Sequence, residues 1–163
     1  VKLNPGKPID AVLINACECE PMLTADHRVL LEYADDVIAG LQLMMQAVNA
    51  PKGVIVIENN KPEAIAAMGA AVRELGYPGI EVKVLKKRYP QGGEKVLVYH
   101  TTGRKIHANQ LPIDVGCIVV NCTTLAAIGA QLPFSIKAMV RLLKLRSVRW
   151  LINSRIKGNI SAL

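Results

Sequence analysis

Aromatic residues are scarce in this sequence of 163 residues, which contains one Phe, one Trp and four Tyr. Proteins that bind single-stranded nucleic acid stack the bases on aromatic side chains, so this composition argues against such a partner. Acidic residues are absent beyond Asp114, whereas residues 1–114 carry thirteen Lys or Arg and thirteen Asp or Glu. The formal net charge of +7 therefore belongs to the last part of the chain. A basic tail is weaker evidence for a polyanionic partner than a basic face on the fold, and we do not expect nucleic acid binding.

The sequence also lacks cysteine pairs with metal-ligand spacing, since it contains no Cys-x-x-Cys motif. Its cysteines are Cys17, Cys19, Cys117 and Cys122. Each lies in or beside an apolar run, which favours reduced thiols in the core or in the wall of a site over metal ligands. Free thiols are typical of a reducing cytoplasm, which is the location we expect.

No apolar run is long enough to predict a membrane span. The longest candidate, residues 125–143, is interrupted by Gln131, Pro133, Lys137 and Arg141. Val1-Lys2-Leu3 is followed at once by polar, proline and glycine residues, so no signal peptide is predicted. The apolar fraction of 51% is ample for the core of one domain.

Apolar runs and helical spacing alternate along the first 130 residues. Short apolar runs bounded by turn residues predict buried strands at 11–14, 53–57, 80–84 and 115–120. Apolar residues recur at helical spacing over 26–49 and 62–75, and another helix is predicted from Asn121 onward. The run 96–99 suits a strand or a helix. Strands joined by helical crossovers pair in parallel, so the sequence predicts an α/β fold: a three-layer Rossmann-like domain with a mainly parallel sheet flanked by helices.

Three polar clusters follow predicted strands or a glycine turn, and the carboxyl ends of parallel strands line the ligand crevice in such folds. The first, residues 15–21, offers an amide and two carboxylates to the donors of a ring or ribose, although alone it is more often a solvated loop. The second, residues 92–95, has adjacent glycines that let backbone approach a flat ligand, although a hairpin turn is equally compatible. The third, residues 121–124, stands at a helix start that favours phosphate, although a plain helix cap is the commoner interpretation.

No constellation of catalytic side chains stands out. His27, His100 and His107 have no nucleophile partner at a telling spacing, and we expect all three at the surface. Neither a Ser-His-Asp pattern nor a pair of hydrolase carboxylates is visible, so no catalytic side chain is predicted.

Five segments read together are far more specific than any one alone. They are LINACECEP at 13–21, TADHR at 24–28, IENNKPEAI at 57–65, YPQGGEK at 89–95 and LPIDVG at 111–116. In this order they resemble the flavin-binding domain of the Rnf complex C subunit. The domain is more distantly similar to the flavin- and NADH-binding subunit of respiratory complex I, and to cobalamin-reductase and proline-reductase relatives.

The resemblance implies part of an NADH:acceptor oxidoreductase, in which NADH reduces bound FMN and electrons pass to iron–sulfur clusters outside this chain. FMN and NADH are the implied cofactors, and 4Fe-4S clusters are expected only in the full-length family. By motif match, the residues expected at the flavin or nicotinamide are Asn15, Glu18 and Glu20. Those expected near the ring and the NADH path are Gly92, Gly93 and Glu94. Those expected near the flavin phosphate or ribityl chain are Asn121 and Thr124.

The resemblance also divides the chain. Residues 1–130 are the expected FMN/NADH-binding domain, and 131–163 depart from the family as a divergent basic tail. Relatives carry a glycine-rich loop before the first segment, and Val1-Lys2-Leu3 resembles its end. We therefore expect the loop to be missing and Lys2, its closing lysine, to be a further cofactor-binding residue.

The implied partners are other subunits of an electron-transfer complex, through which the chain would lie at the inner face of the cell membrane. The alternative is a non-catalytic binding or docking module that keeps the fold without a flavin. The missing loop and the basic tail motivate that alternative.

Overall fold

Four parallel strands form one sheet in the computed structural model, which describes residues 6–20 and 22–132. The strands are β1 (Ala11–Ala16), β2 (Lys52–Glu58), β3 (Ile80–Leu85) and β4 (Cys117–Asn121). Their order in the sheet is β3-β2-β1-β4, and each neighbouring pair is parallel. The predicted α/β class and parallel sheet are confirmed.

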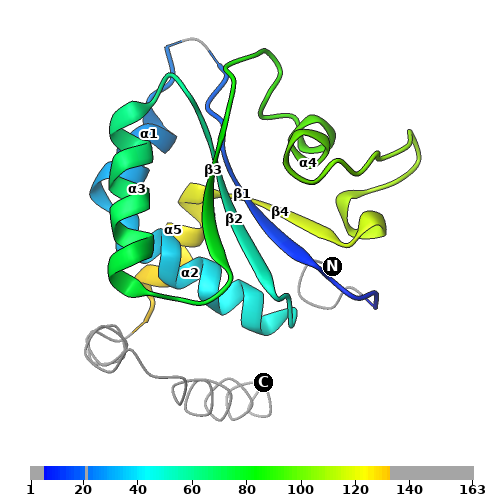
Figure 1. Cartoon of the computed structure of the whole chain (residues 1–163), viewed down its shortest axis with the longest axis horizontal. Helices are drawn as coiled ribbons and strands as arrows, with labels where there is room; N and C mark the ends of the chain where they lie inside the picture. Colours follow the sequence, from blue (N-terminus) through cyan, green and yellow to red (C-terminus); the bar gives the residue numbers. More distant parts are fainter. Residues whose placement is uncertain (1–5, 21, 133–163) are drawn as a thin grey trace. The chain divides into compact units, whose positions relative to one another are not determined.

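Helices cover both faces of the sheet and complete the three predicted layers (Figure 1). One face carries α1 (Ala25–Glu32), α2 (Ala34–Ala47), α3 (Pro62–Leu75) and α5 (Cys122–Ala130). The other face carries α4 (Glu94–Thr102), with a 3-10 helix at Pro112–Val115 near the start of β4.

Strand β1 is apolar from Ala11 to Ile14 because both of its faces are covered. On β1, Val12 and Ile14 pack toward the face with four helices, while Ala11 and Leu13 pack toward α4. All four side chains are at most 6% exposed. Successive residues of a strand point to opposite faces, so a continuous apolar run is what a doubly covered strand requires.

The single helix predicted over 26–49 is wrong, because the chain leaves the helical conformation at Tyr33. This residue has φ −127° and ψ 32°, and it separates α1 from α2. Helix α1 packs chiefly against α3, whereas α2 packs chiefly against α5. The break lets the two segments follow different neighbours, and no Gly or Pro in the sequence signals it.

Residues 96–99, whose pattern suits either a strand or a helix, lie in α4. This helix ends at Gly103, which adopts a left-handed conformation with φ 76° that suits glycine. The 3-10 helix at Pro112–Val115 is not indicated by any sequence pattern.

Helices α2 and α5 touch backbone to backbone at two glycines. A methyl group on Gly40 would collide with the carbonyl oxygen of Leu125, and one on Gly129 with that of Asp36. Glycine is therefore required for this close crossing, which fixes α5 and the end of β4 beside the α1–α2 segment.

The carboxyl ends of the strands meet at one edge of the sheet. Ala16 pairs with Ile57, and Asn15 pairs with Asn121, so the segments after β1, β2 and β4 leave the sheet at the same level. This brings together the regions in which the sequence predicts a ligand crevice.

The predicted tail at 131–163 lies outside the described residues apart from Gln131 and Leu132, so its separation from the domain stays a prediction. Within the described part of the chain, no helix has the length and apolarity needed to cross a bilayer.

Candidate functional site

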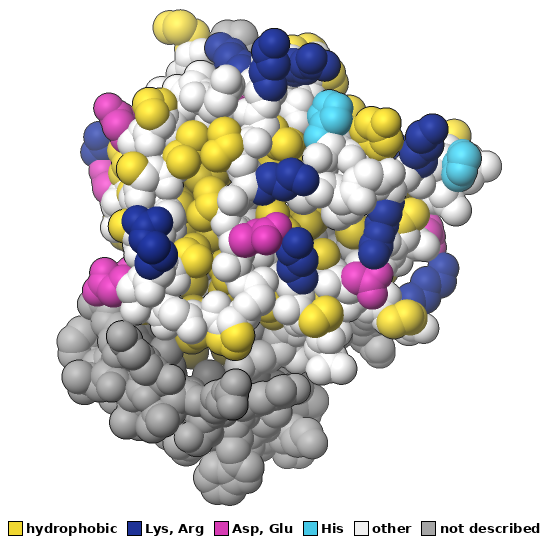
Figure 2. Space-filling view, viewed as in Figure 1, with side chains coloured by type: hydrophobic (Ala, Val, Ile, Leu, Met, Phe, Trp, Pro, Cys, Tyr) yellow, Lys and Arg dark blue, Asp and Glu magenta, His cyan; other side chains and the backbone are white. Residues whose placement is uncertain are grey.

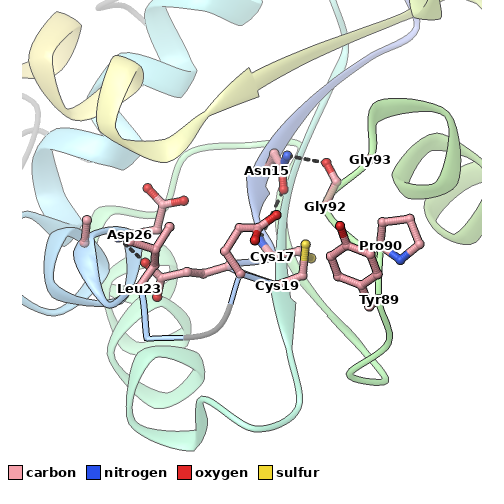
Figure 3. A pocket seen from close by; sticks show the side chains of 12 residues that line it. Asn15, Cys17, Cys19, Leu23, Asp26, Tyr89, Pro90, Gly92 and Gly93 are labelled. Atoms are coloured by element: carbon pink, nitrogen blue, oxygen red, sulfur yellow. Dashed lines mark hydrogen bonds between the residues drawn. The ribbon is translucent and has the colours of Figure 1, made fainter.

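A pocket of about 400 Å³ opens at the carboxyl end of β1. Its walls come from the segment after β1, the start of α1 and the loop between β3 and α4 (Figure 3). The lining residues are Asn15, Cys17, Glu18, Cys19, Glu20, Leu23, Ala25, Asp26, Tyr89, Pro90, Gly92 and Gly93. The volume falls within the range of small-molecule and cofactor sites, roughly 300–1,000 Å³.

Asn15 joins two walls of this pocket. Its Nδ2 donates to the carbonyl oxygen of Gly92 at 2.8 Å, and its Oδ1 accepts from the N–H of Cys17 at 3.2 Å (Figure 3). A Cβ on Gly92 would lie 2.6 Å from the carbonyl oxygen of Cys17. Glycine at this position therefore permits the close approach of the two loops, and backbone forms this part of the wall.

Glu18 has partners on both carboxylate oxygens. Oε1 accepts from the N–H of Asp26 at 3.0 Å, and Oε2 contacts Nζ of Lys61 at 3.2 Å. The side chains of Lys61 and Glu18 are 16% and 5% exposed, so the ion pair is largely shielded from water. The carboxylate also lies at the start of α1, where the helix dipole favours negative charge. Glu18 thereby ties α1 and the β2–α3 loop to the pocket.

Asp26 links the pocket to α5. Its carboxylate accepts from Nδ2 of Asn121 at 3.1 Å and from Oγ1 of Thr123 at 3.2 Å. Asn121 caps α5 in turn, since its Oδ1 accepts from the N–H of Thr123 at 2.8 Å. The pKa of the buried Cys122 thiol is raised, first by burial and then by the charge of Asp26.

All four cysteines are free, and two of them, Cys17 and Cys19, line the pocket. The Sγ of buried Cys17 donates to the carbonyl oxygen of Val56 at 3.6 Å. Burial raises the pKa of the Cys17 thiol to about 12, and the negative charge of Glu58 adds to the rise. Cys19 is half-buried.

Glu58, the last residue of β2, is a buried acid close to Cys17. It is 0% exposed, and neither carboxylate oxygen has a hydrogen-bond partner within residues 6–20 and 22–132. An unsatisfied buried polar group costs about 1–3 kcal/mol, so Glu58 destabilises the fold.

Two of the three histidines are half-buried, contrary to the sequence prediction. Nε2 of Gln91, a residue only 2% exposed, lies 3.0 Å from Nδ1 of His100. The ring of His27 faces the carboxylate of Glu63 at 3.7 Å, with its side chain 20% exposed. Only His107 is exposed as predicted.

Five of the predicted site residues line the pocket: Asn15, Glu18, Glu20, Gly92 and Gly93. Glu94 does not line it but begins α4 as an exposed residue. Asn121 reaches the pocket only through Asp26, and Thr124 is exposed in the first turn of α5. Lys2 lies outside the described residues.

The sequence does not predict the roles of Asp26 and Lys61, which stand at the start of one predicted helix and just before another. Both lie within the segments TADHR and IENNKPEAI that carry the resemblance. Their presence in these segments is the sequence signal that could have identified them as site residues. Within the described residues, no group of three or more His, Cys, Asp or Glu side chains is arranged to hold a metal ion.

The sequence of this chain is similar to those of known proteins. Residues 1–130 match the family described as the Nuo51 FMN-binding domain. The chain is 45% identical over 127 residues to the C subunit of the proton-translocating ferredoxin:NAD(+) oxidoreductase complex of Clostridium ljungdahlii. It is 42% identical over 129 residues to the C subunit of the Na(+)-translocating ferredoxin:NAD(+) oxidoreductase complex of Acetobacterium woodii.

These alignments cover 77% and 78% of this chain, but only 27% and 28% of the relatives. The chain thus spans about a quarter of their length. Among solved structures, NAD+-reducing NiFe hydrogenase in the air-oxidized state superposes with a TM-score of 0.66, over 79% of this chain and 25% of that chain. Sequence identity there is 23%, so the similarity concerns the fold alone.

Proposed function

Because the chain belongs to the family of the Nuo51 FMN-binding domain, we propose that its pocket binds FMN and serves NADH-linked electron transfer. The observation that carries the proposal is the hydrogen bond from Asn15 to Gly92, which joins two motif segments into one pocket. The relatives, which are named as C subunits of ferredoxin:NAD(+) oxidoreductase complexes, support the electron-transfer part.

The pocket residues suit a flat ring that carries polar groups. The approach of Gly92 to Cys17 leaves a wall of backbone, against which a planar group can lie closely. The carboxylate of Glu20 has no hydrogen bond or ion pair with any described residue, so it is available to a ring N–H or a ribose hydroxyl. The exposed ring of Tyr89 adds an apolar surface on the opposite wall.

FMN, when bound, would accept a hydride and pass electrons on singly. The chain contributes binding and orientation. Asn15 holds the glycine loop, the Glu18–Lys61 pair fixes the start of α1, and Asp26 orders the first turn of α5. NADH is the proposed hydride source, and iron–sulfur clusters outside this chain are the proposed acceptors.

The partners in this proposal are other subunits of an electron-transfer complex, as the names of the relatives suggest. Through them the chain would lie at the cytoplasmic face of a membrane.

Titration of FMN into the purified chain, followed by quenching of flavin fluorescence, tests the proposal. The same titration is run on the longest open reading frame that contains the chain, because the alignments cover only 27% and 28% of the relatives. We expect saturable quenching at micromolar FMN or below, weaker binding of riboflavin, and bleaching of the bound flavin by NADH without oxygen. Absence of saturation in both proteins would favour the docking module without a flavin.

A further inference from the structure

Three consecutive basic residues follow β3 at the edge of the pocket. Lys86, Lys87 and Arg88 are all exposed, and they directly precede Tyr89 and Pro90, which line the pocket. Their side chains form no ion pair or hydrogen bond with any residue that the structure describes. Figure 2 shows basic side chains gathered at the top edge of the molecule, above the loop that follows β3.

The backbone of this loop is anchored at several points. The N–H of Lys87 donates to Oδ1 of Asn59 at 2.9 Å, and the N–H of Asn59 donates to the carbonyl oxygen of Leu85 at 2.8 Å. The N–H of Gln91 donates to the carbonyl oxygen of Arg88 at 2.7 Å. The three cations therefore extend from a fixed position beside the pocket.

The pocket itself carries the opposite charge. Glu18, Glu20 and Asp26 line it, and Lys61, the cation beside it, is paired with Glu18. This acidic lining disfavours phosphate, so the phosphates of a dinucleotide are better placed outside it. The basic residues next to Tyr89 are the charges at the rim that can hold them.

We propose that Lys86, Lys87 and Arg88 form a basic rim that binds the pyrophosphate of a dinucleotide whose nicotinamide enters the pocket. The ring of Tyr89, 75% exposed between rim and pocket, offers a planar face to the part of the ligand that crosses it. This inference rests on the proposed use of NADH and assigns its phosphates to named residues. Because the rim is exposed, its contribution should weaken as salt is added.

The test compares two variants of equal net charge. The rim variant is Lys86→Gln/Lys87→Gln/Arg88→Gln. The control, Lys52→Gln/Arg73→Gln/Lys105→Gln, removes three exposed basic residues outside the pocket lining. Titration calorimetry at low salt measures the affinity for NADH, for reduced nicotinamide mononucleotide with one phosphate, and for reduced nicotinamide riboside with none.

We expect the rim variant to bind NADH roughly ten- to a hundredfold more weakly, the mononucleotide less affected and the riboside unchanged. The control should bind all three like the unmodified chain. Equal losses for NADH and riboside, an unchanged affinity for NADH, or the same loss in the control would each overturn the proposal. FMN affinity is measured separately on the same proteins, so failure of the flavin proposal is distinguished from failure of the rim.

Discussion

The side-chain amide of Asn15 donates a hydrogen bond of 2.8 Å to the carbonyl oxygen of Gly92, which lies 77 residues further along the chain. The bond joins the end of β1 to the loop before α4, so the pocket exists only in the folded domain. Neither segment alone forms a binding site.

Gly92→Ala should weaken FMN binding roughly ten- to a hundredfold, because overpacking of this kind costs about 1–3 kcal/mol. The added methyl would lie 2.6 Å from the carbonyl oxygen of Cys17, and backbone must move to admit it. Gly69→Ala is the control, since its methyl would lie 3.5 Å from the flexible side chain of Arg73 within α3. Fluorescence titration compares the two, and an unchanged affinity in Gly92→Ala would contradict the assigned wall.

Lys61→Met should lower the free energy of unfolding by about 3 kcal/mol, because it leaves the shielded carboxylate of Glu18 without its cation. Lys52→Met is the control. Its pair with Glu81 has both side chains 51% exposed, and such a pair contributes under about 1 kcal/mol. Urea denaturation measures both variants, and equal losses would show that the Glu18–Lys61 pair is an ordinary surface contact.

Glu58→Met should raise the free energy of unfolding by about 1–3 kcal/mol, since it removes an unsatisfied buried carboxylate at similar volume. Gln91→Met should lower it, because Gln91 is equally buried but has His100 as a partner. Thermal denaturation at neutral pH distinguishes the two variants. A loss of stability in Glu58→Met would mean that Glu58 has a stabilising role.

Stability should fall as pH rises from about 9 to about 12. The Cys17 thiol titrates near 9.0 in the unfolded chain, while burial raises its pKa to about 12 in the fold. Between these values the folded state keeps a proton that the unfolded state releases, so unfolding is favoured by about 1.4 kcal/mol per pH unit for this thiol. Below pH 9 the contribution is intact.

Denaturation curves at several alkaline pH values measure this slope. Tyr77 adds to it, because burial, followed by the charge of Asp35, raises its pKa from 10.0 to about 12. Cys17→Ala should reduce the dependence of stability on pH by the contribution of this one thiol. An identical slope in that variant would refute the assignment to Cys17.

The fold could be predicted from the sequence because the central residues of β1, β2 and β4 are buried on both faces of the sheet. Runs such as 11–14 and 53–57 are apolar at every position, and only a covered parallel sheet accommodates several of them. The break at Tyr33 escaped prediction because the apolar spacing continues across it, and the bend follows from different neighbours of α1 and α2.

The sequence predicted site residues only where the residues of a motif themselves line the pocket. Asn15, Glu20 and Gly92 stand at strand ends or glycine turns, and they line the pocket. Asp26 and Lys61 act through contacts with residues distant in sequence, namely Asn121 and Glu18. Such contacts depend on strand order and helix packing, which local pattern does not specify.

Amide chemical-shift mapping during an FMN titration tests the central claim most directly. We predict saturable shifts concentrated at 15–20 and 89–93, with no change at Lys52 or Gly79, which lie outside the pocket lining near the starts of β2 and β3. Shifts that gather at those strand starts, or that never saturate, would contradict a flavin site in this pocket.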